Sequence, residues 1–130
     1  MESYLGEIMA FHRQRTLFDS RNVSDRLKEL SPVRNSFFEP LYNNSNISLI
    51  AEIKRRSPSK GVLNSNLDVP SYVRAYSENG ATAISVLTDS QFFGGSPGDL
   101  ILAHEISDIP LLRKDFIVSK NDVIDAIEWG

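Results

Sequence analysis

Residues 49–54 read Leu-Ile-Ala-Glu-Ile-Lys, an apolar run that ends in charge. Residues 111–116, Leu-Leu-Arg-Lys-Asp-Phe, repeat that arrangement further along the chain. Continuous apolar runs of this length are typical of buried strands in a parallel sheet. Each run carries a lysine, Lys54 or Lys114, near its C-terminal end. Because a lysine is costly to bury without a partner or a function, the two together suggest an active site whose substrate carries negative charge or a carbonyl group to be protonated.

The elements expected around these runs follow the order of an α/β protein. Strands are predicted over residues 48–54, 82–88 and 110–117, and a helix is predicted after each of them. The residues expected to begin these helices are Asp68, Ser96 and Asn121. The order β-α-β-α-β-α indicates a parallel sheet that is covered by helices on at least one face.

The sequence before residue 47 has a different character. Residues 4–17 are predicted to form an amphipathic helix, and Ser24 is expected to cap a short helix with Leu27 and Leu30 facing inward. The apolar cluster Phe37, Phe38 and Leu41 is expected to cover other parts of the chain. We therefore expect two parts, a helical extension over residues 1–46 and the main fold over residues 47–130.

Alternation along the strands predicts which side chains share a face. One face should pack under the helices and carry Ile53, Ile84, Val86 and Leu111. The other should carry Glu52, Lys54, Ser85, Leu87, Lys114 and Phe116, and should become charged toward the C-terminal strand ends, where parallel α/β proteins place their active sites. The alternative for Glu52 and Lys54 is an ordinary surface ion pair. Arg55 and Arg56 are expected to be solvent-facing loop charges. The third helix, which Asn121 is expected to cap, should have an inner stripe of Val123, Ala126 and Ile127.

Composition narrows the function classes. The chain has 130 residues, a net charge of −3 and no cysteine, so we expect one ordinary domain without disulfides, thiolate metal sites or a basic field that recruits nucleic acid. His12 and His104 have no second histidine at ligand spacing, so no metal is expected. No apolar run approaches the ~18 residues of a membrane span, and the start has no signal-peptide pattern. We therefore expect no membrane partner and a cytosolic location.

Three long motifs resemble the indole-3-glycerol phosphate synthase family of tryptophan biosynthesis. They are Ile-Ala-Glu-Ile-Lys-Arg-Arg-Ser-Pro-Ser-Lys-Gly (residues 50–61), Gly-Ala-Thr-Ala-Ile-Ser-Val-Leu-Thr-Asp (80–89) followed by Phe-Phe-Gly-Gly-Ser (92–96), and Pro-Leu-Leu-Arg-Lys-Asp-Phe-Ile (110–117). The resemblance implies a (β/α)8 TIM barrel. It also implies a carboxy-lyase that closes the indole ring of 1-(2-carboxyphenylamino)-1-deoxyribulose 5-phosphate, with loss of CO2 and water and without metal or organic cofactor.

The resemblance also assigns residue roles. Lys114 matches the lysine that protonates the ribulose carbonyl, Lys54 the lysine that contacts the substrate carboxylate, and Glu52 the carboxylate beside it. Which lysine donates a proton at which step stays open. Leu87, Phe93 and Phe116 match positions of the apolar pocket around the anthranilate ring, and Ser57 and Pro58 match the loop after the first strand. The phosphate site of the family lies in the loops after strands seven and eight, which have no counterpart here.

A barrel of this kind takes roughly 250 residues, and only its first three βα units are expected in this chain. Three parallel strands cannot close a barrel, and their edges carry unpaired backbone groups. We therefore expect the chain alone to be inactive, its missing strands coming from a longer protein, from another chain, or from self-association. Two alternatives remain, a non-catalytic half-barrel interaction module and another phosphosugar barrel such as phosphoribosylanthranilate isomerase.

Overall fold

The computed structural model describes residues 3–31 and 36–130 and contains two compact units. Within the described ranges, the first unit takes its residues from 3–31 and 116–128, and the second from 36–115 and 129–130. No helix within the described ranges is long and apolar enough to cross a membrane.

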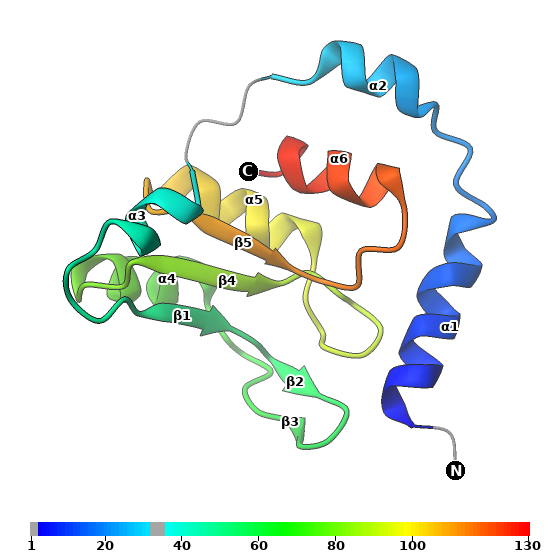
Figure 1. Cartoon of the computed structure of the whole chain (residues 1–130). Coiled ribbons are helices and arrows are strands. Elements are labelled where there is room, and N and C mark those ends of the chain that lie inside the picture. The colour runs from blue at the N-terminus through cyan, green and yellow to red at the C-terminus, as the bar shows by residue number, and fades with distance from the viewer. Residues whose placement is uncertain (1–2, 32–35) are drawn as a thin grey trace. The chain divides into compact units, whose positions relative to one another are not determined.

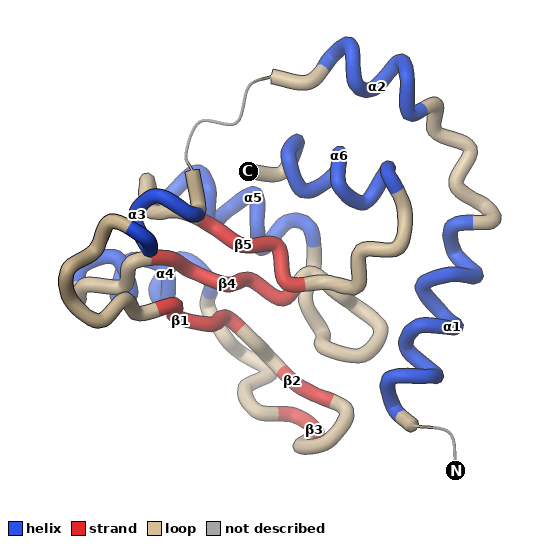
Figure 2. Tube along the Cα trace, viewed as in Figure 1, coloured by secondary structure: helices blue, strands red, loops and turns tan. Residues whose placement is uncertain are grey.

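A parallel sheet organises the second unit. Its strands are β1 (Ile50–Ile53), β4 (Ala83–Leu87) and β5 (Leu111–Lys114), which pair in the order β1-β4-β5. The helices α4 (Val69–Glu78) and α5 (Pro97–Ile106) connect consecutive strands and lie on one side of the sheet (Figure 1 and Figure 2). The expected α/β fold with a parallel sheet is therefore confirmed.

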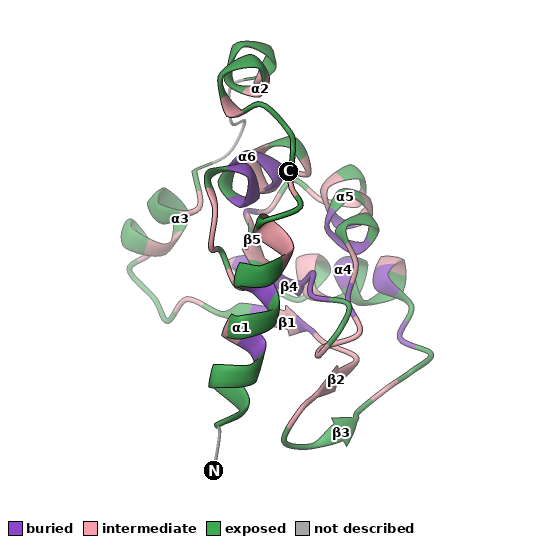
Figure 3. Cartoon of the chain, turned by 90° about the vertical axis from the view of Figure 1, so that its right-hand side faces the viewer, coloured by how far each residue is buried: buried purple, intermediate pink, exposed green. Residues whose placement is uncertain are grey.

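Strand register divides this sheet into a covered face, which packs on α4 and α5, and an open face on the opposite side. The core of the covered face consists of Ile53, Leu67, Val69, Val73, Ile84, Val86, Leu100 and Ala103. Every residue of β4 is buried (Figure 3). On the open face, by contrast, Ile50 of β1 is 46% exposed and Leu112 of β5 is 40% exposed. The predicted covered-face residues Ile53, Ile84 and Val86 are thus confirmed as core.

Side-chain caps fix where α4 and α5 begin. The Asp68 carboxylate accepts a hydrogen bond from the Ser71 N–H, and the Ser96 hydroxyl accepts one from the Asp99 N–H. Pro70 and Pro97 lie in the first turns, where the missing proline N–H costs nothing. Both helix starts agree with the sequence prediction because capping depends only on neighbouring residues.

Two short elements of the second unit differ from expectation. The hairpin of β2 (Arg56–Ser57) and β3 (Gly61–Val62) was not predicted, since two-residue strands have no periodicity to detect. The helix α3 (Phe38–Tyr42) carries part of the apolar cluster that was expected to cover other parts of the chain. Instead, Phe38 is 64% exposed and stacks on Tyr42 of the same helix, with ring centroids 5.0 Å apart.

The first unit contains α1 (Tyr4–Thr16), α2 (Val23–Glu29) and α6 (Lys120–Glu128). Arginines join α2 and the loop before it to α6: Arg21 and Arg26 each donate to Asp125 at 2.6 Å. The predicted inward-facing residue Leu27 is 55% exposed, and Asn22 rather than Ser24 caps α2. The apolar prediction for α2 was therefore wrong, because charged hydrogen bonds replace an apolar stripe.

The start of α6 also differs from the prediction. Ser119, not Asn121, caps it, since the Asp122 N–H donates to the Ser119 hydroxyl. Asn121 is buried and accepts a hydrogen bond from Arg26. Val123 is 51% exposed, whereas Ile124 and Asp125 are buried, so the inner face of α6 is rotated from the predicted stripe.

Asp122 is the buried anchor of α6. Its carboxylate accepts hydrogen bonds from the N–H groups of Val118 and Ser119 and from the Arg15 guanidinium at 2.7 Å. Asp122→Asn should lower the free energy of unfolding by about 2 kcal/mol, the scale of a hydrogen bond to a charged group. Chemical denaturation followed by circular dichroism measures this. The control Asp25→Asn, at an exposed ion pair with Lys28, should change it by less than about 0.5 kcal/mol.

The same carboxylate predicts acid sensitivity. Burial alone would raise the pKa of Asp122, but hydrogen bonds from the Val118 N–H and Arg15 outweigh it and set the pKa below its ordinary value. The stabilisation is then fully present above the unfolded-state pKa of about 3.9 and is lost as pH falls through the lower folded-state pKa. The stability difference between the natural chain and Asp122→Asn should shrink below about pH 4. A difference that stays constant to pH 2 contradicts this reading.

Candidate active site

The open face of the sheet gathers polar side chains toward the C-terminal strand ends. Glu52, Ser85 and Leu112 lie side by side across β1, β4 and β5. One step further along, Leu87 pairs with Lys114. Because alternate residues share a face, these two rows point to the same side of the sheet.

An ion pair marks the end of β1. The Lys54 ammonium lies 2.6 Å from the Glu52 carboxylate, and about a third of each side chain is exposed, 32% and 33%. The main chain beneath it is held by Tyr76 of α4, whose hydroxyl donates to the Glu52 carbonyl at 3.2 Å. This arrangement fixes the direction of the Lys54 side chain while leaving it partly accessible.

Lys114 ends β5, with β4 between it and Lys54. Neighbouring strands lie about 4.8 Å apart, so the two lysines stem from backbones roughly 10 Å apart. Both side chains project from the same face of the sheet, on either side of β4. The sequence predicted a buried lysine here, but Lys114 is exposed, because β5 is the outer strand of the sheet in the described residues.

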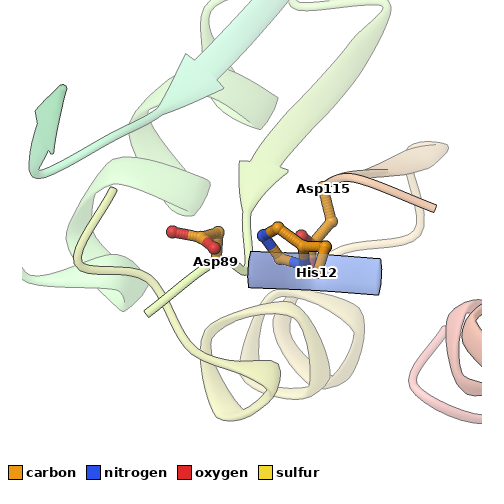
Figure 4. Close-up of side chains that lie close together, drawn as sticks. All are labelled: His12, Asp89 and Asp115. Carbon is orange, nitrogen blue, oxygen red and sulfur yellow. The ribbon is translucent and has the colours of Figure 1, made fainter. Parts of the chain in front are cut away.

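The loop after β4 is folded around one carboxylate. Asp89 accepts hydrogen bonds from the N–H groups of Phe92 and Phe93, at 2.6 and 3.0 Å. Gly95 closes the loop through its N–H, which donates to the Asp89 carbonyl at 2.8 Å. Phe93 is partly buried in this loop. Figure 4 shows Asp89 and also Asp115, which follow β4 and β5 respectively.

Two arginines that follow β1 bind groups that follow β4, one in α5 and one in the loop before it. The Arg55 guanidinium binds both carboxylate oxygens of Asp99, which raises the pKa of Arg55. Arg56 donates to the carbonyls of Ser90 and Gln91. The prediction that both arginines face solvent was wrong, because their partners lie more than 30 residues away and leave no local trace in the sequence.

The remaining predicted site residues fall in two places. Ser57 and Pro58 belong to the β2–β3 hairpin, where the Ser57 hydroxyl accepts a hydrogen bond from the Lys60 N–H at 3.2 Å. Phe116 belongs to the first unit, where its ring centroid lies 5.3 Å from that of His12. The second unit thus brings together Glu52, Lys54, Leu87 and Lys114 at its strand ends, and Phe116 is not part of that unit.

Sequence reasoning assigned no role to several polar groups at these strand ends. The Ser85 hydroxyl is buried on the open face and has no hydrogen-bond partner among the described residues. Thr88, Arg113 and Asp115 form hydrogen bonds to one another beneath the end of β5. Arg113 and Asp115 flank Lys114 in the sequence. This pair of charges on either side of a candidate catalytic lysine is the signal from which a role for both residues could have been predicted.

The parallel sheet, with charged groups at its C-terminal strand ends, places the chain in the α/β class, whose members commonly carry their functional sites at that end of the sheet. The sequence model of the family "Indole-3-glycerol phosphate synthase" matches residues 5–130. The chain therefore belongs to the indole-3-glycerol phosphate synthase family, a family of TIM-barrel lyases. This match favours the synthase over the isomerase alternative.

Relatives with the same name show sizeable identity over part of the chain. The "Indole-3-glycerol phosphate synthase" of Bacillus mycoides (strain KBAB4) is 55% identical over 83 residues, which is 64% of this chain and 33% of that protein. The protein of that name from Syntrophobacter fumaroxidans is 50% identical over 84 residues, 65% of this chain and 32% of that protein. The matched region spans about a third of the length of these curated relatives.

Gly95 provides a test of the loop that holds Phe93. A Cβ at Gly95 would lie 2.0 Å from the Leu87 carbonyl oxygen, a backbone atom that cannot yield. Gly95→Ala should therefore displace the loop and destabilise the chain by about 1–3 kcal/mol. Thermal unfolding measures the stability, and amide chemical shifts of Phe92 and Phe93 report the loop.

Gly98→Ala is the matched control. Its Cβ would meet only the Ser96 hydroxyl at an ordinary 3.5 Å. Because it lies inside α5, alanine should stabilise the helix by up to about 1 kcal/mol. Equal changes in stability for Gly95→Ala and Gly98→Ala would contradict the close contact between Gly95 and the Leu87 carbonyl.

Proposed function

We propose that this chain supplies the first part of an indole-3-glycerol phosphate synthase active site. In the proposed reaction, the aromatic carbon of 1-(2-carboxyphenylamino)-1-deoxyribulose 5-phosphate attacks the ribulose carbonyl carbon. This new carbon–carbon bond closes the ring; CO2 then leaves from the attacked aromatic carbon, water leaves from the former carbonyl carbon, and no metal or organic cofactor is needed. The main support is that Glu52, Lys54 and Lys114 all stand at the C-terminal ends of strands of one parallel sheet.

The proposed roles follow from charge and position. Lys114 donates a proton to the carbonyl oxygen as the carbon–carbon bond forms. Lys54 contacts the substrate carboxylate and takes part in proton transfer, and Glu52 orients it and accepts a proton during dehydration. The 2.6 Å contact between Lys54 and Glu52 supports this division, since the ion pair fixes the direction of the lysine side chain.

Apolar groups complete the proposed site. Leu87 is buried next to Lys114 in the strand register, and Phe93 follows in the loop fixed by Asp89. We assign both to the pocket for the anthranilate ring, together with Phe116, whose assignment rests on the family motif. We assign Ser57 and Pro58 to the polar rim of the substrate. An apolar surrounding disfavours a carboxylate relative to CO2 and would assist its loss.

We further propose that residues 1–46 form the helical extension and that residues 47–130 form the first three βα units of a (β/α)8 barrel. The remaining strands would pair with the outer edges of β1 and β5. We also propose a cytosolic location, in keeping with the biosynthetic family to which the chain belongs.

A non-catalytic interaction module is the second candidate. It is favoured by the partial exposure of Ile50 and Leu112 on the open face, since apolar side chains of a sheet are normally covered by a further layer. The two candidates differ in whether Lys114 matters: an enzyme requires its amine, whereas a module requires only the apolar surface.

Lys114→Ala should strongly reduce synthase activity while leaving a measurable residual rate. We suggest a fusion protein in which residues 1–130 are joined to the part of the Bacillus mycoides relative that lies beyond the matched region. The fluorescence of the indole product measures the rate of ring closure. Loss of the general acid should lower kcat by about 10²–10⁴-fold. Lys28→Ala, at an exposed ion pair of the first unit, is the control and should retain full activity. An inactive parent fusion, or a Lys114→Ala variant with the activity of the parent, would refute the proposed function.

Residues 1–130 alone should be inactive and should self-associate through the open face and the edges of the sheet. On size exclusion they should elute above the 14.6 kDa of one chain. Leu112→Glu places a charge on the open face and should shift the population toward the monomer. Ile101→Glu is the control, because Ile101 is similarly exposed, at 38%, but lies on α5. Monomeric behaviour of the unaltered chain would contradict self-association.

A further inference from the structure

A buried ion pair lies beneath the end of β5. The Arg113 guanidinium and the Asp115 carboxylate are 3.0 Å apart, and only 6% and 5% of their side chains are exposed. A buried pair of this kind seldom adds stability compared with apolar residues of similar volume, because both charges lose their hydration. Its presence in an otherwise apolar layer therefore calls for a role other than stability.

The pair flanks Lys114 and holds the strand from the opposite face. Arg113 lies beside Val86 in the register, on the covered face, while Lys114 lies beside Leu87 on the open face. Alternation places Asp115 on the same side as Arg113. The residues before and after the lysine are thus anchored under the sheet, and this anchoring directs the lysine side chain away from it.

Thr88 connects this ion pair to the next strand. Its hydroxyl donates to Asp115 at 2.6 Å and accepts from the Arg113 Nε at 3.2 Å. Its backbone N–H donates to the Lys114 carbonyl, also at 3.2 Å. One residue at the end of β4 therefore binds Arg113, Lys114 and Asp115.

Trp129 contacts the Arg113 guanidinium of this ion pair. The Arg113 guanidinium carbon lies 4.5 Å from the centre of the Trp129 ring, a cation–π distance. The Trp129 ring limits the guanidinium on one side, and the hydrogen bonds to Thr88 and Asp115 fix its orientation. A satisfied polar network of this kind is rigid, because any rotation leaves a buried charge without its partner.

We propose that Thr88, Arg113 and Asp115 form a positioning unit that sets the direction of the Lys114 amine. The inference rests on the proposed role of Lys114 as proton donor. The three residues act through the backbone of Lys114 rather than on the substrate. Proton transfer requires a near-attack distance, and misplacement by about 1 Å costs on the order of 10²-fold in rate. A rigid unit beneath the strand supplies that precision to a lysine on an outer strand.

The test uses Thr88→Val in the fusion protein described above, since valine keeps the shape of threonine and removes its hydroxyl. We expect kcat to fall about 10- to 100-fold with KM changed less than about threefold, because the substrate-binding groups on the open face are untouched. Thr88→Ser keeps the hydroxyl and should restore kcat to within about threefold of the parent.

A double-mutant cycle separates positioning from general damage. If Thr88 acts through Lys114, Thr88→Val should have no further effect on the residual rate of Lys114→Ala. A similar loss of rate in both backgrounds, or an unchanged kcat in Thr88→Val, overturns the inference. Should Thr88→Val fail to fold, Arg113→Lys serves instead, because it keeps the charge but loses the fork and the stacking; the same cycle and outcomes apply. An inactive parent fusion refutes the proposed function, whereas an active parent with unaffected variants refutes the positioning unit alone.

Discussion

Side-chain alternation along parallel strands in register is the constraint on which the second unit depends. The row of Ile53, Val86 and Arg113 and the row of Glu52, Ser85 and Leu112 are one residue apart, yet they face opposite sides of the sheet. A slip of one residue would move Glu52 into the core and Ile53 out of it. The apolar contacts under α4 and α5 that stabilise the sheet therefore also fix where its charges point.

The elements that depend on local patterns could be predicted from the sequence. The strands around Ile53 and Val86 are continuous apolar runs, and the starts of α4 and α5 are set by Asp68 and Ser96 with a proline just after each. These signals involve residues a few positions apart, so they can be recognised in the sequence without knowledge of the rest of the fold. The candidate site could be predicted from the same kind of pattern. Alternation along the strands places Glu52 and Lys114 on one face, and both lie in the motifs that resemble the family.

The parts that failed depend on partners far away in the sequence. Arg55 has an ordinary loop context, and only the fold brings Asp99 of α5 to it. Arg26 binds Asp125 across 99 residues, which leaves Leu27 of the same helix exposed. Apolar periodicity assumes that a helix is held by its apolar side chains. It gives the wrong inner face whenever charged hydrogen bonds hold the helix instead.

The two lysines differ in the partner that strand geometry can offer them. Residues two apart on a strand share a face, so Glu52 can pair with Lys54 without help from any other element. The residue two before Lys114 is Leu112, which cannot pair, and Lys114 forms no ion pair with the described residues of the chain. Its neighbours Arg113 and Asp115 satisfy each other on the opposite face. The fold thus pairs Lys54 with a carboxylate and leaves Lys114, on a backbone bound by Thr88, without an ion pair among the described residues.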